Sequence, residues 1–279
     1  MSYAGAWGQA SLTLPEFIAR AGRLGYSSVM LGGKRPHLSP LDAPPQFVEQ
    51  LQAALVRAGV TCDVVAAYTN LASGPAAEVP LVEFQIAYVD SLSRLANQLG
   101  ASIVRVFTAY ETDEREPATL RRHVIDAVRE MCDRSAAHGV TIAIQNHHDL
   151  ALDTDDLLDL LSEINRSNCK LAFDAWSPAL RGEDLYAVAK KTASFVAITT
   201  NADYVRVPRY RYRPELVNYE RLLPDQVRAV PFGTGLIDYP AFFRGLADGG
   251  YRGPATYEIR SPIRGGGESR DYGRPNHRR

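Results

Sequence analysis

One junction recurs along the chain: an amphipathic segment, a glycine, and then a short run of β-branched and small apolar residues. It appears as AGRLG-YSSVML, LVRAG-VTCDVV, ANQLG-ASIVRVF, SAAHG-VTIAIQ and ADGG-YRGPATYEI. A glycine at this position ends a helix in a left-handed residue, which carries no steric cost when Cβ is missing. The runs that follow show little alternation, which is typical of parallel strands buried on both faces. The repeat therefore predicts alternating helices and parallel strands.

The strands predicted from this pattern number eight along the chain. They cover residues 2–6, 27–31, 62–67, 102–107, 141–145, 169–173, 195–200 and 255–259. Alternation without a second composition zone favours one parallel α/β domain, and eight strands favour a closed barrel. The 279 residues are also close to the roughly 250 of such barrels. We predict a single (β/α)8 TIM barrel over residues 1–260, with a flexible Gly/Arg-rich tail at 261–279.

Two regions depart from the repeat. Residues 201–236 form a long connection rich in Tyr, Arg and Pro, longer than compact domains normally use without a function. It is either a solvated loop or a lid that folds over an anionic or polyhydroxylated substrate through its arginines. At the C-terminus no eighth helix is recognisable, so we predict that the last helix is missing or degenerate. Apolar surface left bare there would be covered by a partner subunit, which predicts a homo-oligomer; the alternative is an altered C-terminus.

Composition and motifs exclude several classes of protein. No apolar run reaches the 18 or so residues that span a bilayer, and the N-terminus lacks a secretory pattern. Three cysteines without C-x-x-C spacing argue against a disulfide scaffold or zinc ribbon and fit a reducing cytoplasm. A net charge of −1 gives no case for nucleic-acid or membrane partners. Nucleotide-binding glycine motifs and G-x-S-x-G are absent. We expect a cytoplasmic protein that binds a small molecule.

The strongest candidates for chemistry lie where predicted strands end, because barrel enzymes place reactive groups at the carboxyl ends of their strands. The segment QNHHD supplies Gln145, His147 and His148, the densest cluster of ligands and acid-base groups in the chain. Asp174 closes the strand KLAFD and Glu258 closes ATYEI. A lone carboxylate there could be a helix cap. Two carboxylates on neighbouring strands that point into the same end of the barrel favour metal binding or proton transfer.

Aromatic and basic side chains that follow predicted strands, and two arginines of the connection at 201–236, are predicted to contact the substrate. They are Trp7, Lys34, His37, Tyr68, Tyr110, Trp176, Arg206 and Arg209.

The sequence resembles the xylose-isomerase-like TIM-barrel sugar isomerases and epimerases. The resemblance runs from about Thr13 to Gly267 and is carried by GYSSVML with GKRPHLSPLD, VRVFTAYE, GVTIAIQNHHD, KLAFDAW, VPFGTGLIDYPAFF and YRGPATYEIRSP. It implies a divalent metal held by Glu, Asp, His and Glu at four strand ends. The two glutamates would shuttle a proton at the carbon next to a carbonyl, while the cation stabilises the enediolate.

The match to that ligand set is incomplete. Asp174 and Glu258 stand where the family has Asp and the last Glu, but the first Glu is Gln145. The expected His falls at Ile198 or Thr199, neither a good ligand. The resemblance thus predicts Mn²⁺, Mg²⁺, Zn²⁺ or Co²⁺ on Gln145, Asp174 and Glu258, with His147 or His148 as a replacement ligand. The alternative, from the incomplete match, is that no metal binds.

Three hypotheses remain open. The first is an isomerase or epimerase of a keto-sugar or polyol, metal-assisted, with Glu258 as base and His147 or His148 as its partner. The second is a metal-free barrel that dehydrates or cyclises a biosynthetic intermediate, because one fold hosts many chemistries. The third is a non-catalytic binding protein or partner subunit.

Overall fold

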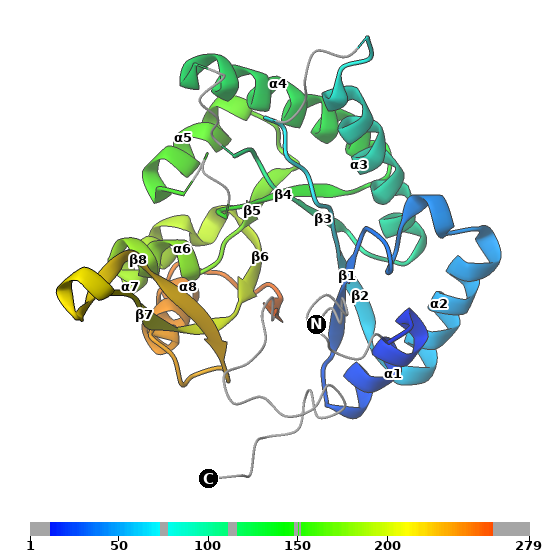
Figure 1. Cartoon of the computed structure of the whole chain (residues 1–279). Helices are drawn as coiled ribbons and strands as arrows, with labels where there is room; N and C mark the ends of the chain where they lie inside the picture. Colours follow the sequence, from blue (N-terminus) through cyan, green and yellow to red (C-terminus); the bar gives the residue numbers. More distant parts are fainter. Residues whose placement is uncertain (1–11, 73–77, 111–115, 148–149, 151, 259–279) are drawn as a thin grey trace.

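The computed structural model describes residues 12–72, 78–110, 116–147, 150 and 152–258. Within them, seven parallel strands form one sheet in the order β1-β2-β3-β4-β5-β6-β9. The sheet curves into a nearly closed barrel with helices around its outside (Figure 1). The strands are β1 (Ser28–Gly32), β2 (Thr61–Ala66), β3 (Ile103–Val106), β4 (Thr141–Gln145), β5 (Cys169–Ala172), β6 (Val196–Asn201) and β9 (Ala255–Tyr257). The predicted TIM-barrel fold is confirmed; the strand expected at 2–6 and the tail at 261–279 lie outside the described residues.

Helices connect the strands as the glycine junctions predict. They are α1 (Leu14–Arg23), α2 (Pro45–Ala58), α3 (Leu81–Gln98), α4 (Pro117–Ala136), α5 (Thr154–Ile164), α6 (Trp176–Arg181), α7 (Leu185–Thr192) and α8 (Tyr239–Asp248). The five predicted junction glycines all have φ between +65° and +91°, the region that glycine adopts without a Cβ clash. At the start of α1, Thr13 and Glu16 form the reciprocal capping box that the sequence indicates.

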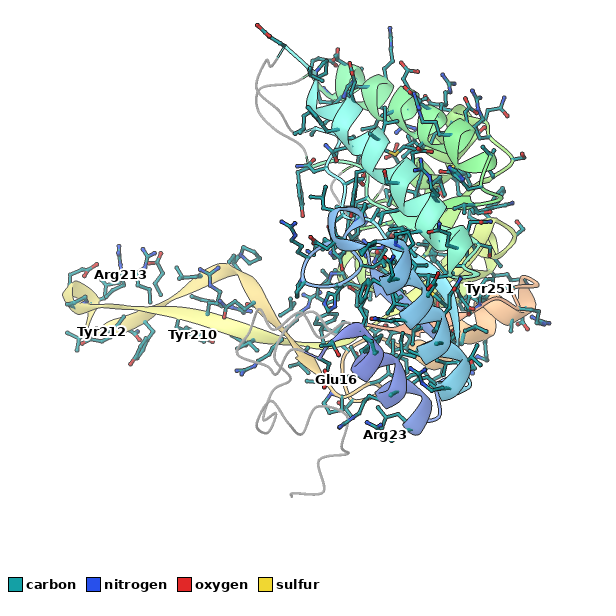
Figure 2. All side chains as sticks on the ribbon, turned by 90° about the vertical axis from the view of Figure 1, so that its right-hand side faces the viewer. Glu16, Arg23, Tyr210, Tyr212, Arg213 and Tyr251 are labelled. Atoms are coloured by element: carbon teal, nitrogen blue, oxygen red, sulfur yellow. The ribbon has the colours of Figure 1, made fainter. Side chains whose placement is uncertain are left out.

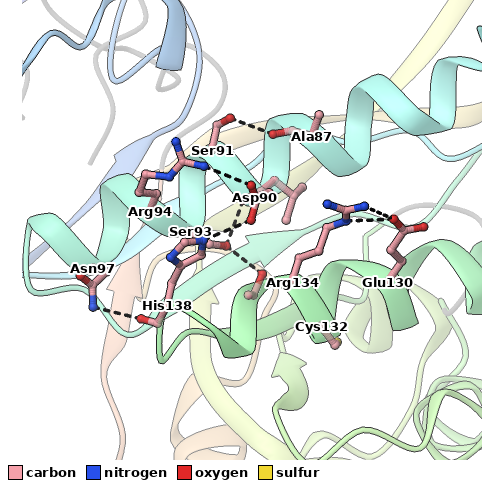
Figure 3. Close-up of polar contacts among 12 residues, drawn as sticks. Ala87, Asp90, Ser91, Ser93, Arg94, Asn97, Glu130, Cys132, Arg134 and His138 are labelled. Carbon is pink, nitrogen blue, oxygen red and sulfur yellow. Dashed lines mark hydrogen bonds and ion pairs between the residues drawn. The ribbon is translucent and has the colours of Figure 1, made fainter.

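The helices pack on the outside of the sheet through a large apolar cluster, with polar contacts where two of them meet. Between α3 and α4 the buried hydroxyls of Ser93 and Ser135 lie 2.8 Å apart. Nearby, His138 Nε2 lies 3.1 Å from Asp90 Oδ1, and Asn97 donates to the carbonyl of His138 (Figure 3). These contacts fix neighbouring helices and so fix the strand ends they connect.

The inside of the barrel holds a second, smaller apolar cluster. It consists of Met30, Val64, Ala66, Ile103, Ala143, Ala172 and Ile198. Since alternate strand residues share a face, the next inward positions toward the carboxyl ends are Tyr68, Arg105, Gln145, Asp174 and Thr200. The apolar floor of the barrel therefore gives way to polar side chains at one end.

Residues 201–236 are not the irregular connection that we expected. Most of them form a two-stranded antiparallel ribbon, β7 (Asp203–Arg213) and β8 (Asn218–Val230). Figure 2 shows the ribbon extending away from the barrel, with Tyr210, Tyr212 and Arg213 far from its base. Tyr, Val and Arg have side chains that suit a strand, and cross-strand rings such as Tyr212 and Tyr219 pack 5.3 Å apart.

None of the described helices is long and apolar enough to cross a membrane. All three cysteines are buried and free, as the absence of a disulfide pattern predicts.

Candidate active site

A pocket opens at the carboxyl ends of β4, β5, β6 and β9. It is lined by Gln145, His147, Asp174, Trp176, Thr200, Asn201, Ala202, Tyr204 and Glu258. The structure thus brings together five of the residues predicted from the sequence, Gln145, His147, Asp174, Trp176 and Glu258. They meet because parallel strands deliver their C-terminal side chains to the same end of a barrel.

Asp174 is the most buried ionisable group of the pocket, with 4% of its surface exposed. Its Oδ1 accepts hydrogen bonds from the backbone N–H groups of Trp176 (3.1 Å) and Ser177 (3.3 Å) at the start of α6. Its Oδ2 accepts from Gln145 Nε2 at 2.9 Å. One carboxyl group therefore anchors a helix with one oxygen and faces the pocket with the other.

The pKa of Asp174 is raised to about 6. Burial is the main cause, because it disfavours the charged form. The hydrogen bonds from Gln145, Ser177 and Trp176 act in the opposite direction, and the negative charge of Glu258 adds to the increase. Asp174 can thus change protonation state near neutral pH, which is the property of a general acid or base.

Gln145 is held in one orientation by two acceptors. Its Nε2 donates to Asp174 Oδ2 and to Thr200 Oγ1, both at 2.9 Å. Its Oε1 is buried and has no hydrogen-bond partner in the described part of the chain. The amide therefore offers one unused acceptor to whatever enters the pocket, but as an amide it cannot act as a base.

The next residue, Asn146, ties β4 to the end of β5. Its Nδ2 donates to the carbonyl of Asp174 at 3.0 Å, and its Oδ1 accepts from the Asp174 N–H at 2.8 Å. Ser177 donates through Oγ to the carbonyl of Asn146. This paired contact fixes the backbone that carries Asp174.

Glu258 follows β9 and is partly exposed at the opposite side of the same pocket. Its N–H donates to the carbonyl of Asn201 at 2.9 Å. Asn201 in turn donates to Thr199 Oγ1 and to the carbonyl of Thr256. These bonds hold the end of β9 against β6, and with it the position from which Glu258 enters the pocket.

The donor set does not fit the four-ligand metal site that the resemblance implies. In the described residues no three His, Cys, Asp or Glu side chains are grouped to hold a metal ion. The Gln145 amide also directs an N–H, not an oxygen, at Asp174 Oδ2. On β6, Thr200 and Asn201 line the pocket, and neither is the histidine that the family has on this strand. A hydroxyl there supplies no charge for a divalent cation.

A second group of side chains adjoins the pocket through His147. The ring of His147 packs 5.6 Å from that of Phe107. Arg105 Cζ lies 4.0 Å from the Phe107 centroid and 5.0 Å from that of Tyr68, whose other contact is Lys34 Nζ at 3.7 Å. Two predicted substrate-binding residues, Lys34 and Tyr68, therefore meet beside the pocket around a buried arginine that we did not single out.

Other predicted residues are not part of the described pocket. Arg206 and Arg209 lie on β7 and donate to the backbone carbonyls of Leu180 and Pro224, at 3.5 and 3.4 Å. Neither arginine lines the described pocket, and their role as substrate contacts stays a prediction.

Two more candidates lie elsewhere at this end of the barrel. His37 is buried, and burial followed by the charge of Lys34 lowers its pKa. Tyr110 is about half exposed, and its N–H donates to Asn70 Oδ1. Trp7 and His148 lie outside the described residues.

The GTG segment that resembles the family has a structural role here. Asp203, at the base of the ribbon, accepts from the N–H groups of Gly233 (2.9 Å) and Gly235 (2.7 Å) through Oδ2. Tyr204, the next residue, packs its ring 4.1 Å from that of Trp176. The turn therefore fixes one wall of the pocket.

Comparison with known proteins agrees with this architecture. The sequence profile of the xylose isomerase-like TIM barrel family matches residues 18–275. The chain belongs to this family. Among curated proteins it is similar to the rhizopine catabolism protein MocC of Rhizobium meliloti, with 28% identity over 128 residues, covering 44% of this chain and 38% of that protein. The aligned part thus spans well under half of that relative.

Solved structures of the family superpose over nearly the whole chain. The 3-keto-D-glucoside 4-epimerase YcjR from E. coli aligns with a TM-score of 0.69 and 16% identity, covering 94% of this chain and 91% of that one. The probable 3-DHS dehydratase AsbF from Bacillus anthracis also gives 0.69 and 16%, covering 90% and 88%. At these identities the likeness establishes the shared fold.

Proposed function

We propose that the chain is an enzyme that moves a proton at the carbon next to a carbonyl group of a small polyhydroxylated keto compound, as an isomerase or epimerase. The observation that carries this proposal is the pairing of two carboxyl groups, Asp174 and Glu258, in one pocket. Burial brings the pKa of Asp174 to about 6, within reach of neutral pH. Membership of the xylose isomerase-like family supports the same chemistry.

In this proposal Glu258 removes the proton from carbon. It lines the pocket and is partly exposed there, so its carboxylate can reach a bound substrate. Protonated Asp174 donates to the carbonyl oxygen as negative charge develops there, and Gln145 holds that carboxyl in place. His147, which also lines the pocket, returns a proton to carbon as the enediol gives one O–H proton back to Asp174. Glu258 then passes its proton to solvent, and His147 takes one up from solvent. No step needs a second glutamate at position 145.

Dehydration is the second candidate, favoured by the replacement of one shuttle carboxylate by Gln145. A single base with a single acid suits elimination. Glu258 would take the proton from the carbon next to the carbonyl. The electron pair of that C–H bond would form a C=C bond to the neighbouring carbon as the C–O bond of the hydroxyl there breaks. Asp174 would give its proton to the departing hydroxyl, which leaves as water. The likeness in fold to a dehydratase is compatible with this alternative.

Turnover of a panel of keto-sugars, keto-polyols and keto acids, followed by NMR, tests the proposal. Loss of the base in Glu258→Gln should reduce the rate by about 10²- to 10⁴-fold. The control is Glu49→Gln, which removes an exposed carboxylate on α2. A product of unchanged mass indicates isomerisation, and loss of one water indicates dehydration. If Glu258→Gln keeps wild-type turnover, the proposed base is wrong, and a partner-subunit role becomes the better hypothesis.

The resemblance to the family predicts a bound divalent metal, but the described side chains predict weak binding. Because the described donors do not make up its ligand set, we expect purified protein to hold less than stoichiometric Mn, Mg, Zn or Co after exposure to each ion. Elemental mass spectrometry of the wild type beside Asp174→Asn decides this. Near-stoichiometric metal that is lost in the variant would contradict our expectation and restore the metal-assisted route.

A further inference from the structure

Arg105 is a buried cation without a described counter-charge. It lies on β3 between Ala66 of β2 and Ala143 of β4 in the strand register. It is 0% exposed, and none of its three side-chain nitrogen atoms has a hydrogen-bond partner among the described residues. The small neighbours leave its long side chain room inside the barrel.

Such an arginine is costly unless something binds it. The guanidinium cannot lose its proton in a protein, and it carries five N–H donors. Burying a charge without partners disfavours the folded state. Contacts with the rings of Phe107 and Tyr68 compensate in part through cation–π attraction. Among the described residues, no acceptor takes a hydrogen bond from its three nitrogen atoms.

We propose that Arg105 binds a carboxylate group of the substrate. A guanidinium offers two parallel N–H donors that match the two oxygens of a carboxylate. The proposal deepens the function inferred above and rests on it: the substrate of the Asp174–Glu258 pocket is an acidic keto compound and not a neutral sugar.

The position of Arg105 relative to the pocket supports this assignment. Phe107 contacts both the guanidinium, 4.0 Å from its ring centroid, and the ring of His147, 5.6 Å away. His147 lines the same pocket as Asp174 and Glu258. A small keto acid with its carboxylate on Arg105 would thus extend toward the two acid-base groups.

The aromatic rings would control access to the site. Arg105 is covered, so an anion reaches it only when a neighbouring ring moves, and Tyr68 is the partly exposed one. Lys34 Nζ lies over the same Tyr68 ring, 3.7 Å from its centroid. Rotation of that ring would bring the anion between two cations.

Binding of matched probes tests the proposal: 2-keto-D-gluconate, which is acidic, D-fructose, which is neutral, and D-fructose 6-phosphate. Calorimetry should show the wild type binding the keto acid about 10- to 100-fold more tightly than fructose, the range expected for hydrogen bonds to a charged group. Arg105→Met should abolish that preference and leave fructose unchanged. Arg105→Lys keeps the charge but loses the paired donors, so its preference for the acid should lie between those of the wild type and Arg105→Met. It also replaces Arg105→Met in the test if that variant does not fold.

Thermal unfolding separates this role from a structural one. Without probe, Arg105→Met should unfold at the wild-type temperature or above, because it removes an uncompensated buried charge. Three results would overturn the proposal. They are equal affinity of the wild type for the keto acid and fructose, a preference for the acid that keeps its full strength in Arg105→Lys, and tighter binding of D-fructose 6-phosphate than of the keto acid. Repeating the titration in Glu258→Gln makes the two proposals separable, since that variant should still bind the acid even if the proposed proton transfer is wrong.

Discussion

Asp174 combines two tasks that usually fall to different residues. One oxygen accepts from the backbone at the start of α6, and the other faces Gln145 in the pocket. Its raised pKa means that the folded protein binds a proton more tightly than the unfolded chain. Stability from this group is therefore present at low pH and is lost as pH rises from about 4 through 6.

Asp174→Asn should remove this pH dependence. A pKa of about 6, against an ordinary value of 3.8, corresponds to about 3 kcal/mol. We expect the free energy of unfolding of the wild type, relative to the variant, to fall by roughly that amount between pH 4 and pH 7.5. Urea unfolding at both pH values measures it, with Asp159→Asn on the exposed face of α5 as control. An unchanged difference across this range would mean that Asp174 titrates normally.

The sequence predicts Gln145, Asp174 and Glu258 at one site because each stands at the carboxyl end of a predicted strand, and a parallel barrel brings such positions together. It does not single out Arg105 or Thr200. These side chains lie within or at the end of apolar runs, where a polar residue is read as part of the strand. Inward alternation from Ile103 and Ile198 is the signal that would have found them.

Helices and strands could be predicted where apolar residues recur at a regular spacing within one segment. Leu120, Val124, Val128 and Met131 on α4 are all buried, as their helical spacing indicates. The β7–β8 ribbon was missed because both of its faces are largely exposed. A strand that is not half-buried lacks the apolar-polar alternation used to recognise one. The Tyr/Arg alternation near Tyr210 is the signal that remained.

The turn at the base of the β7–β8 ribbon requires a glycine at position 235. A Cβ at Gly235 would collide with the Asp203 carboxylate and the carbonyl of Tyr204. Gly235→Ala should therefore cost about 1–3 kcal/mol of stability, separate Tyr204 from Trp176 and lower turnover. Urea unfolding measures the stability, Trp fluorescence reports the separation of the two rings, and the turnover assay measures the third effect. Thr234→Ala, at an exposed position of the same turn, is the control; if the two variants behave alike, the close contact is unimportant.

For the whole molecule, the homo-oligomer stays a prediction, and the ribbon is where we expect contact. Large apolar side chains are exposed along it, among them Leu216, Val217, Tyr219 and Leu223. A two-stranded ribbon is marginally stable by itself. Residues 203–230 carry six arginines against four acidic residues, in a chain of net charge −1, so the rest of a second copy is acidic.

Sedimentation velocity tests this expectation. The wild type should sediment as a dimer or larger, and Leu223→Glu on the ribbon should shift it toward the monomer. The control is Leu41→Glu, an equally exposed leucine on the barrel. A monomeric wild type at micromolar concentration would contradict the expectation.

The central claim is that the Asp174–Glu258 pocket moves a carbon-bound proton. The most direct measurement is deuterium incorporation at the carbon next to the carbonyl of 2-keto-D-gluconate and D-fructose in D₂O, followed by NMR. Our account predicts enzyme-dependent exchange, faster for the acid, at least about 100-fold slower in Glu258→Gln and unchanged in Glu49→Gln. Exchange no faster than in buffer, or equal exchange in Glu258→Gln, would contradict it.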